Sequence, residues 1–203
     1  FTLPFKFEGK KKAKIAKEAL KDIRRSVNAF SVIPNDRIFQ IIDKSAPLRK
    51  ALAVVNEHLS EAIQGLLEII YGTGIINIDF ADLKTIFSGK GKLAYLNSVH
   101  VQKKDSKEKV FEKIISSPLY PYTIKNGKSV LFNIAGKKNL YLDQVNKIAE
   151  DISKEVSKRA KIIFGISKSK KVTITKVNVL VVGCKEKKTT KKKTTKKKTA
   201  KKK

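Results

Sequence analysis

The sequence predicts an α/β fold. Segments with the periodicity of amphipathic helices alternate with short apolar segments typical of strands. Gly, Pro and Asn, which favour turns, separate many of these segments. Of the 203 residues, 41% are hydrophobic, which is enough to build a core for one or two domains.

The first 44 residues contain two predicted helices and one strand. Apolar residues recur at helical spacing between residues 8 and 27, facing a Lys-rich side: Ile15, Ala19, Leu20, Ile23 and Val27. An apolar run at 30–33 predicts a strand, which the turn residues Pro34, Asn35 and Asp36 end. A brief helix is expected over residues 37–42.

A long helix is predicted over residues 45–71. Ser45 is its expected N-cap and Pro47 lies in its first turn. Apolar residues then recur at helical spacing: Leu48, Leu52, Val55, Leu59, Ile63, Leu66 and Ile70. About seven turns would make a rod of roughly 38 Å. Gly72 and Gly74 end the pattern, so we expect a rigid strut between two α/β regions.

The rest of the folded chain is expected to form a small α/β domain with a mixed sheet. Residues 75–79 precede a short helix at 80–87. Strands are predicted at 93–101, 129–134, 161–166 and 171–182, and helices at 106–115 and 142–156. The connection at 168–170 is short enough for a hairpin, so the last two strands are expected to pair antiparallel. The folded part is expected to end near Gly183.

Charge is the most unusual feature of the composition. The net charge is +28; residues 185–203 contain twelve Lys and one Glu, hence +11, which leaves +17 for the rest. The tail from residue 184 onward is expected to be disordered, because its apolar content is too small to offset an ordering cost of roughly 1–2 kcal/mol per residue. Such a tail could bind nucleic acid or anionic lipid electrostatically, or be a solvated terminus.

Several classes of site are not predicted. With a single cysteine, Cys184, no intramolecular disulfide can form. Neither His58 nor His100 has a partner at metal-ligand spacing, so no metal site is predicted. None of the ten glycines forms a GxxxxGK[ST] loop or a GxGxxG fingerprint. Residue 1 is Phe and the sequence has no Met, so we expect the chain to be a fragment of a longer product.

The strongest candidates for a chemical role are Asn77, Asp79 and Asp82. The two carboxylates lie three residues apart at the start of a predicted helix. On spacing alone, helix capping by Asp79 and a favourable dipole interaction of Asp82 explain them better than catalysis.

Residues 74–86, GIINIDFADLKTI, closely resemble the synergy loop of the bacterial tubulin-like cell-division protein family FtsZ. Further segments match that family in the same order: PFKFEGKK at 4–11, VIPND at 32–36, QG at 64–65, ISSPL at 115–119, LFNI at 131–134 and IFG at 163–165. Because several matches fall in register, the catalytic interpretation of Asn77, Asp79 and Asp82 becomes the favoured one.

The resemblance implies a layout. Residues 1–44 would end a Rossmann-like GTP-binding domain, 45–71 would be the central helix, 72–88 the synergy loop and its helix, 89–183 the C-terminal domain and 184–203 the tail. The glycine-rich phosphate loop would lie upstream of Phe1. Asn56 falls where relatives contact guanine, and Leu52 where many relatives present a stacking aromatic.

The resemblance also implies a function. The intact protein would be a cytoplasmic GTPase that forms the division-ring filament by head-to-tail stacking, with GTP and Mg²⁺ at each junction. Asp79 and Asp82 of one subunit would orient water or a cation at the nucleotide of the next, with help from Asn77, and the fragment alone would be inactive. The tail lacks the peptide by which relatives dock membrane tethers, so the membrane tether is left unknown. The alternative is a basic nucleic-acid-binding protein that uses its polylysine tail.

Overall fold

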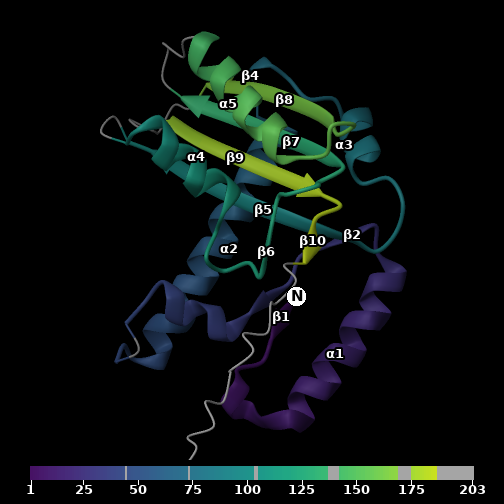
Figure 1. Cartoon of the computed structure of the whole chain (residues 1–203), viewed down its shortest axis with the longest axis vertical. Coiled ribbons are helices and arrows are strands. Elements are labelled where there is room, and N and C mark those ends of the chain that lie inside the picture. Colours follow the sequence, from purple (N-terminus) through teal and green to yellow (C-terminus); the bar gives the residue numbers. More distant parts are fainter. Residues whose placement is uncertain (44, 73, 103–104, 137–141, 169–174, 187–203) are drawn as a thin grey trace, which may run out of the picture.

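A mixed six-stranded sheet organises the molecule (Figure 1). The computed structural model describes residues 1–43, 45–72, 74–102, 105–136, 142–168 and 175–186. The strand order is β2 (Ala29–Phe30), β5 (Lys92–Val101), β9 (Thr175–Val182), β7 (Ser129–Gly136), β8 (Lys161–Lys168) and β4 (Gly74–Ile76). β9 runs antiparallel to both β5 and β7, whereas β7 and β8 are parallel. The predicted mixed sheet is therefore confirmed.

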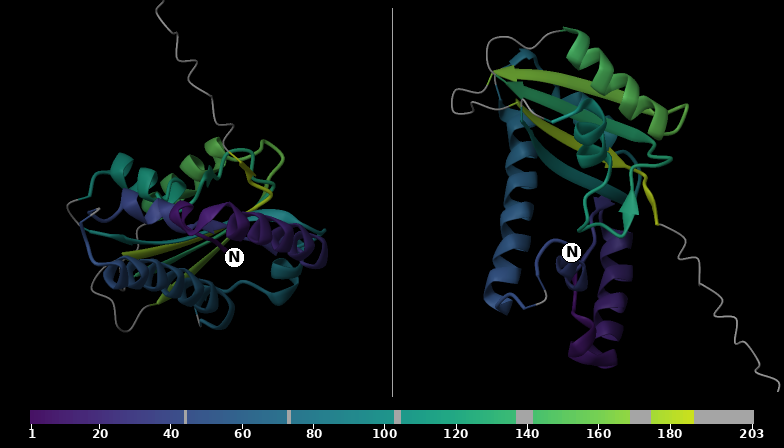
Figure 2. Two further views of the ribbon diagram at one scale, coloured as in Figure 1. Left: turned by 90° about the horizontal axis from the view of Figure 1, so that it is seen from below. Right: turned by 60° about the vertical axis from the view of Figure 1, so that its left-hand side comes forward.

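Helices cover both faces of this sheet. The amphipathic helices α4 (Lys107–Ile115) and α5 (Leu142–Glu155) lie on one face, and the long helix α2 (Leu48–Tyr71) lies on the other (Figure 2, left). Alternate residues of each strand point to opposite faces. Thus Val130, Phe132 and Ile134 of β7 join the larger core cluster, while Leu131 packs with residues of α2 and of α3 (Phe80–Ile86).

The N-terminal part forms a smaller structure beside the sheet. β1 (Thr2–Leu3) pairs with β3 (Ile33–Pro34), and α1 (Gly9–Ser26) lies between them in the chain. The 3₁₀ helix η1 (Lys6–Glu8) lies between β1 and α1, and the 3₁₀ helix η2 (Asn35–Gln40) follows β3. α1 and α2 extend from the same side of the sheet (Figure 2, right). A final two-stranded ladder joins β6 (Tyr122–Thr123) to β10 (Lys185–Glu186), so the folded chain continues past Gly183.

Three sequence predictions about the N-terminal half were wrong in detail. The strand expected at 30–33 is split, because Ser31 and Val32 turn to bond the Tyr122 hydroxyl at 3.0 and 3.1 Å. The helix expected at 37–42 is the 3₁₀ helix η2. Ser45 is not an N-cap: its hydroxyl donates to Asp43 Oδ1 at 2.8 Å, and α2 begins at Leu48 after Pro47.

The predicted hairpin of the last two strands was also wrong. β9 lies between β5 and β7, and β8 pairs with β7 and β4 instead. The central position suits the sequence of β9, because seven of its eight residues are buried. The connection at 169–174 and the tail at 187–203, including its predicted disorder, lie outside the described residues.

Candidate functional site

The loop that contains the candidate residues begins where α2 ends. Gly72 caps α2, and its N–H donates to the Glu68 carbonyl at 2.9 Å. β4 then pairs antiparallel with β8. A Cβ on Gly74 would lie 2.3 Å from the Ile166 carbonyl oxygen, so only glycine allows the loop to approach β8 this closely. The loop is therefore fixed at one end by a helix and along its side by the sheet.

Asn77 stabilises the loop by a hydrogen bond within it. Its Oδ1 accepts a hydrogen bond from the Gly74 N–H at 2.7 Å, which closes a turn of four residues. The side chain is nevertheless exposed. In this structure Asn77 holds the backbone that leads to Asp79.

Asp79 and Asp82 lie together at the start of α3. Asp79 is the N-cap, and its Oδ1 accepts from the Ala81 N–H at 3.4 Å. Asp82 lies in the first turn, and its Oδ1 is 3.9 Å from Lys161 Nζ, with 40% of the Asp82 side chain exposed. Capping by Asp79, the alternative considered from spacing alone, is thus present. Asp79 is nevertheless exposed and Asp82 is partly exposed.

Three large apolar side chains that lie near these acids in the sequence are exposed. Tyr71 is 80% exposed, Ile75 65% and Phe80 62%. Lys84 Nζ lies 5.2 Å from the centre of the Phe80 ring. Large apolar side chains that are exposed along one short segment are typical of an interaction surface. The segment that carries the acids is therefore suited to contact another molecule.

Asn56, the remaining predicted site residue, lies elsewhere. It is exposed on the first half of α2. Asn56 lies fifteen positions before Tyr71, the last residue of α2, which corresponds to about 22 Å of helix. Asn56 and the acidic pair therefore occupy different parts of the chain and do not form a single pocket in one molecule.

A polar contact that the sequence did not reveal joins β9 to the end of α2, just before the loop begins. Lys176 Nζ on β9 donates to both Glu68 carboxylate oxygens at 3.1 Å, and Asn178 Nδ2 donates to Glu68 Oε2 at 3.2 Å. The Lys176 side chain is only 8% exposed. Glu68 is also the residue whose carbonyl caps the end of α2. A lysine within an apolar strand pattern was the available signal.

Known proteins share this architecture. Residues 93–185 match the model of the FtsZ family, C-terminal domain. The structure of an empty FtsZ dimer from M. jannaschii superposes with a TM-score of 0.77 at 30% identity, covering 90% of this chain and 53% of that one. This chain has a tubulin-like fold.

The tubulin-like fold extends to more distant proteins. CetZ from Methanosaeta thermophila gives a TM-score of 0.69 at 18% identity, covering 89% of this chain and 50% of its own. TubZ from Bacillus thuringiensis serovar israelensis, in GDP-form protofilaments, gives 0.63 at 14% identity, with 90% and 52% covered. These two show the fold alone. The chain spans about half the length of the solved structures that it matches.

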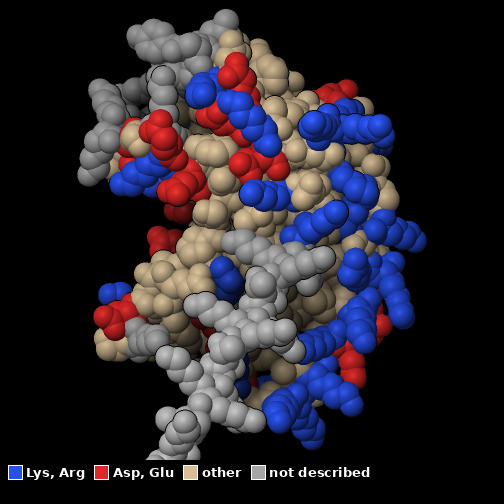
Figure 3. Space-filling view, in the orientation of Figure 1, with Lys and Arg blue, Asp and Glu red and all other residues tan. Residues whose placement is uncertain are grey.

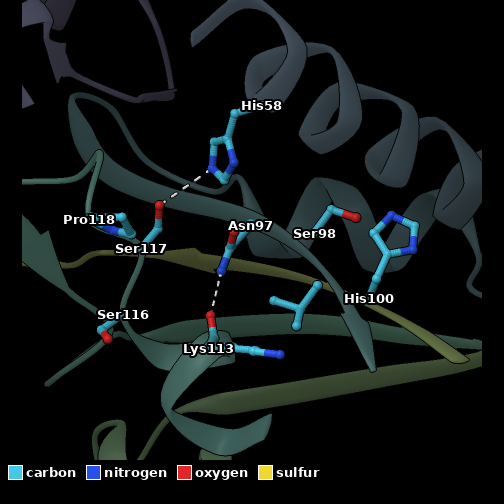
Figure 4. A pocket seen from close by; sticks show the side chains of 9 residues that line it. His58, Asn97, Ser98, His100, Lys113, Ser116, Ser117 and Pro118 are labelled. Carbon is cyan, nitrogen blue, oxygen red and sulfur yellow. Dashed lines mark hydrogen bonds between the residues drawn. The ribbon is translucent and has the colours of Figure 1, made fainter. Parts of the chain in front are cut away.

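One hollow in this tubulin-like fold lies between α2 and β5, away from the acidic loop (Figure 4). It measures about 270 Å³. His58 Nε2 lies 3.4 Å from Ser117 Oγ, and Asn97 Nδ2 donates to the Lys113 carbonyl at 2.8 Å. Burial lowers the pKa of His58, so the imidazole favours its neutral form. These contacts join α2 to the domain and leave few free polar groups for a ligand.

The described residues contain no group of three or more His, Cys, Asp or Glu able to hold a metal ion. None of the helices they form has both the length and the apolar character that crossing a membrane requires.

Proposed function

We propose that this chain is the C-terminal half of a GTP-dependent, filament-forming protein of the cell-division machinery. Subunits stack head to tail, and the loop at residues 72–82 of one subunit meets the nucleotide carried by the next. GTP hydrolysis would then depend on assembly. Its place of action would be the cytoplasmic division site.

The observation that carries this proposal is the setting of the acids. Asp79 and Asp82 lie at the start of α3, directly after a loop that α2 and β8 fix, and exposed apolar side chains lie close to them in the sequence. Burial of Tyr71, Ile75 and Phe80 against another subunit would provide a favourable free energy of about 25 cal/mol per Å² of apolar surface. The same contact would carry the carboxylates into the junction.

Within such a junction the two acids differ in what they can do. Asp79 is oriented by its own helix, because one of its oxygens caps α3. Among the described residues Asp82 is held by a long contact with Lys161, so it can turn toward a water molecule and accept its hydrogen bond. Phosphoryl transfer depends mainly on such positioning and on charge arrangement. We therefore assign the orientation of water chiefly to Asp82.

The nucleotide would contact this chain at two separate places. Asn56, exposed on α2, presents an amide that can both donate to and accept from a base edge. Leu52, 38% exposed one turn earlier, offers only apolar contact. For Mg²⁺, Asp79 and Asp82 can supply one or two oxygens, and phosphates and water would supply the others. The ion would neutralise charge on the transferring phosphoryl group.

The test is Asp82→Asn in a protein in which this chain follows a GTP-binding half. We expect filaments and nucleotide binding to persist, while phosphate release per filament subunit falls on the order of 100-fold, the loss typical of one preorganised polar group. Sedimentation measures assembly, and phosphate release measures turnover.

Asp22→Asn is the matched control. It removes the same charge from an exposed helical position, 3.9 Å from Arg25 and 78% exposed, and should leave turnover unchanged. Full turnover by the Asp82→Asn filaments would return Asp82 to a purely structural role.

A further inference from the structure

Helix α1 carries an unusual concentration of positive charge. Its 18 residues, GKKKAKIAKEALKDIRRS, contain six Lys and two Arg against one Glu and one Asp, a net charge of +6. All eight basic residues are exposed. At 1.5 Å per residue the helix is about 27 Å long. Such a density has no evident role in filament stacking.

Four of these lysines form a line. Lys10, Lys14, Lys17 and Lys21 follow one another at intervals of four, three and four residues, which places them on one side of the helix. We call these four residues the basic stripe. It extends over about 17 Å along the helix axis.

Acidic neighbours compensate the stripe only weakly. Lys14 Nζ lies 4.0 Å from Glu18, and both side chains are more than half exposed. The shortest ion pair of this segment, 2.8 Å, joins Glu8 to Lys12, which lies outside the stripe. Exposed pairs of this kind contribute little and are screened by salt. Most of the charge of the stripe therefore remains available to an external anion.

The other side of α1 holds the helix on the protein. Leu20 packs against the main core cluster, and Ala13, Ala16, Ala19 and Ile23 are half-buried. At the last turn Arg24 Nε donates to the Gly91 carbonyl at 3.3 Å and its guanidinium lies 5.8 Å from the Phe30 ring centre. Lys and Arg gather along this flank of the molecule, over α1 and above it (Figure 3). The stripe is thus presented outward on a fixed helix.

We propose that the basic stripe binds the phosphate backbone of double-stranded nucleic acid. A duplex carries one negative charge per about 1.7 Å of its axis, so about ten phosphates lie within the length of the stripe. An α-helix fits the width of a major groove, about 12 Å. The stripe contains only lysines, which contact phosphates without reading bases, so binding is independent of sequence.

Two features favour a duplex over the other polyanions. Helices that bind membrane surfaces bury their apolar side in the lipid, whereas the apolar side of α1 faces its own protein and Ile15 is its one largely exposed apolar side chain. Single strands are held by stacking on aromatic rings, and the stripe has none. A rigid line of charges therefore matches a duplex best.

The experiment compares two double variants of the full 203-residue chain. Lys17→Gln/Lys21→Gln removes two stripe lysines; Lys11→Gln/Lys12→Gln removes two charges from the same helix outside the stripe. Glutamine has a helix propensity close to that of lysine, and circular dichroism checks that the fold is kept. Fluorescence anisotropy measures binding of a mixed-sequence DNA duplex between about 50 and 200 mM salt.

We expect the slope of log K against log salt to fall by about 2 in the stripe variant, close to 0.9 per lost phosphate contact, and to stay near the wild-type value in the off-stripe variant. The Lys-rich tail is common to all three proteins, so its contribution cancels. Equal slopes in the two variants, or no duplex binding by the wild type, would overturn the proposal. If the stripe variant lost binding to phosphatidylserine vesicles but kept duplex binding, the proposal would be overturned in favour of a membrane surface as the partner of the stripe.

Discussion

At the scale of single residues, Asp79 and Asp82 show how the same side chain takes on different tasks at neighbouring positions. Asp79 has β-region backbone angles and accepts from the Ala81 N–H, as an N-cap does. Asp82 has helical hydrogen bonding and leaves its carboxylate half exposed. The first residue therefore contributes to stability, and the second is free for another task.

This difference can be measured. Asp79→Ala should lower the free energy of unfolding by about 0.5–1 kcal/mol, the lower part of the range for N-caps, because the 3.4 Å bond is long. Asp79→Ser keeps a capping oxygen and should lower the free energy of unfolding by only a few tenths of a kcal/mol. Asp82→Asn should change stability by less than about 0.5 kcal/mol, since it removes a long surface ion pair and a screened charge in the first turn of α3. Urea unfolding of the three variants makes the comparison, and a larger loss for Asp82→Asn than for Asp79→Ala would contradict this assignment.

The sequence predicted the capping role of Asp79 because that role is local. An acid followed by a helical pattern is sufficient to indicate a cap, and the cap is present. The role of Asn77 in closing its own turn was not predicted, because it depends on the backbone direction that β4 imposes. Whether the acids also act on a neighbour's nucleotide depends on a second molecule, which no pattern in one chain specifies.

At the scale of elements, helices were easier to predict than strand partners. α2 and α5 have strong 3.6-residue periodicity, and their bounds fell within a few residues of those expected. The pairing of β9 with β5 and β7 depends instead on contacts with residues about 40 to 90 positions away. A short connection favours a hairpin, but it could not outweigh the burial of seven residues of β9 at the centre of the sheet.

The contact between α2 and β9 gives a prediction at this scale. Glu68→Gln leaves the buried Lys176 ammonium without its carboxylate, whereas Lys176→Met leaves Glu68, 45% exposed, free to be hydrated. We expect Glu68→Gln to cost about 2–3 kcal/mol of unfolding free energy and Lys176→Met clearly less, because unpaired buried charges are the more costly.

The double variant Glu68→Gln/Lys176→Met removes the buried charge altogether. It should recover much of the stability that Glu68→Gln loses, and urea unfolding of the three proteins measures the coupling. Additive losses would show that the pair does not act as a unit.

At the scale of the whole molecule, a buried polar cluster joins the N-terminal segment, the sheet and the end of the folded chain. The Tyr122 hydroxyl donates to the Ala94 carbonyl at 2.9 Å and accepts from the Val32 N–H. The Cys184 N–H donates to the Leu93 carbonyl at 3.0 Å. Burial raises the pKa values of Tyr95, Tyr120 and Tyr122, and raises that of the Cys184 thiol to about 12. These groups all keep their protons while the protein is folded.

Global stability should therefore fall at alkaline pH. Below a pH of about 9 the Cys184 thiol is protonated in both states, so its burial contributes fully. As the pH rises above that value the unfolded chain releases the thiol proton and the folded chain, with a pKa of about 12, does not. The free energy of unfolding then loses about 1.4 kcal/mol per pH unit from this group alone.

Cys184→Ala isolates this effect from the titration of lysines and tyrosines, which both proteins share. The variant should be less stable near neutral pH, because it leaves a small cavity where the side chain is 8% exposed. Between about pH 9 and pH 11 the difference from wild type should shrink and then reverse, since only the wild type loses the thiol contribution. Urea unfolding across that range tests the prediction. A constant difference would mean that the thiol ionises as readily in the folded protein as in the unfolded chain, and that the cluster opens to solvent before the rest of the fold.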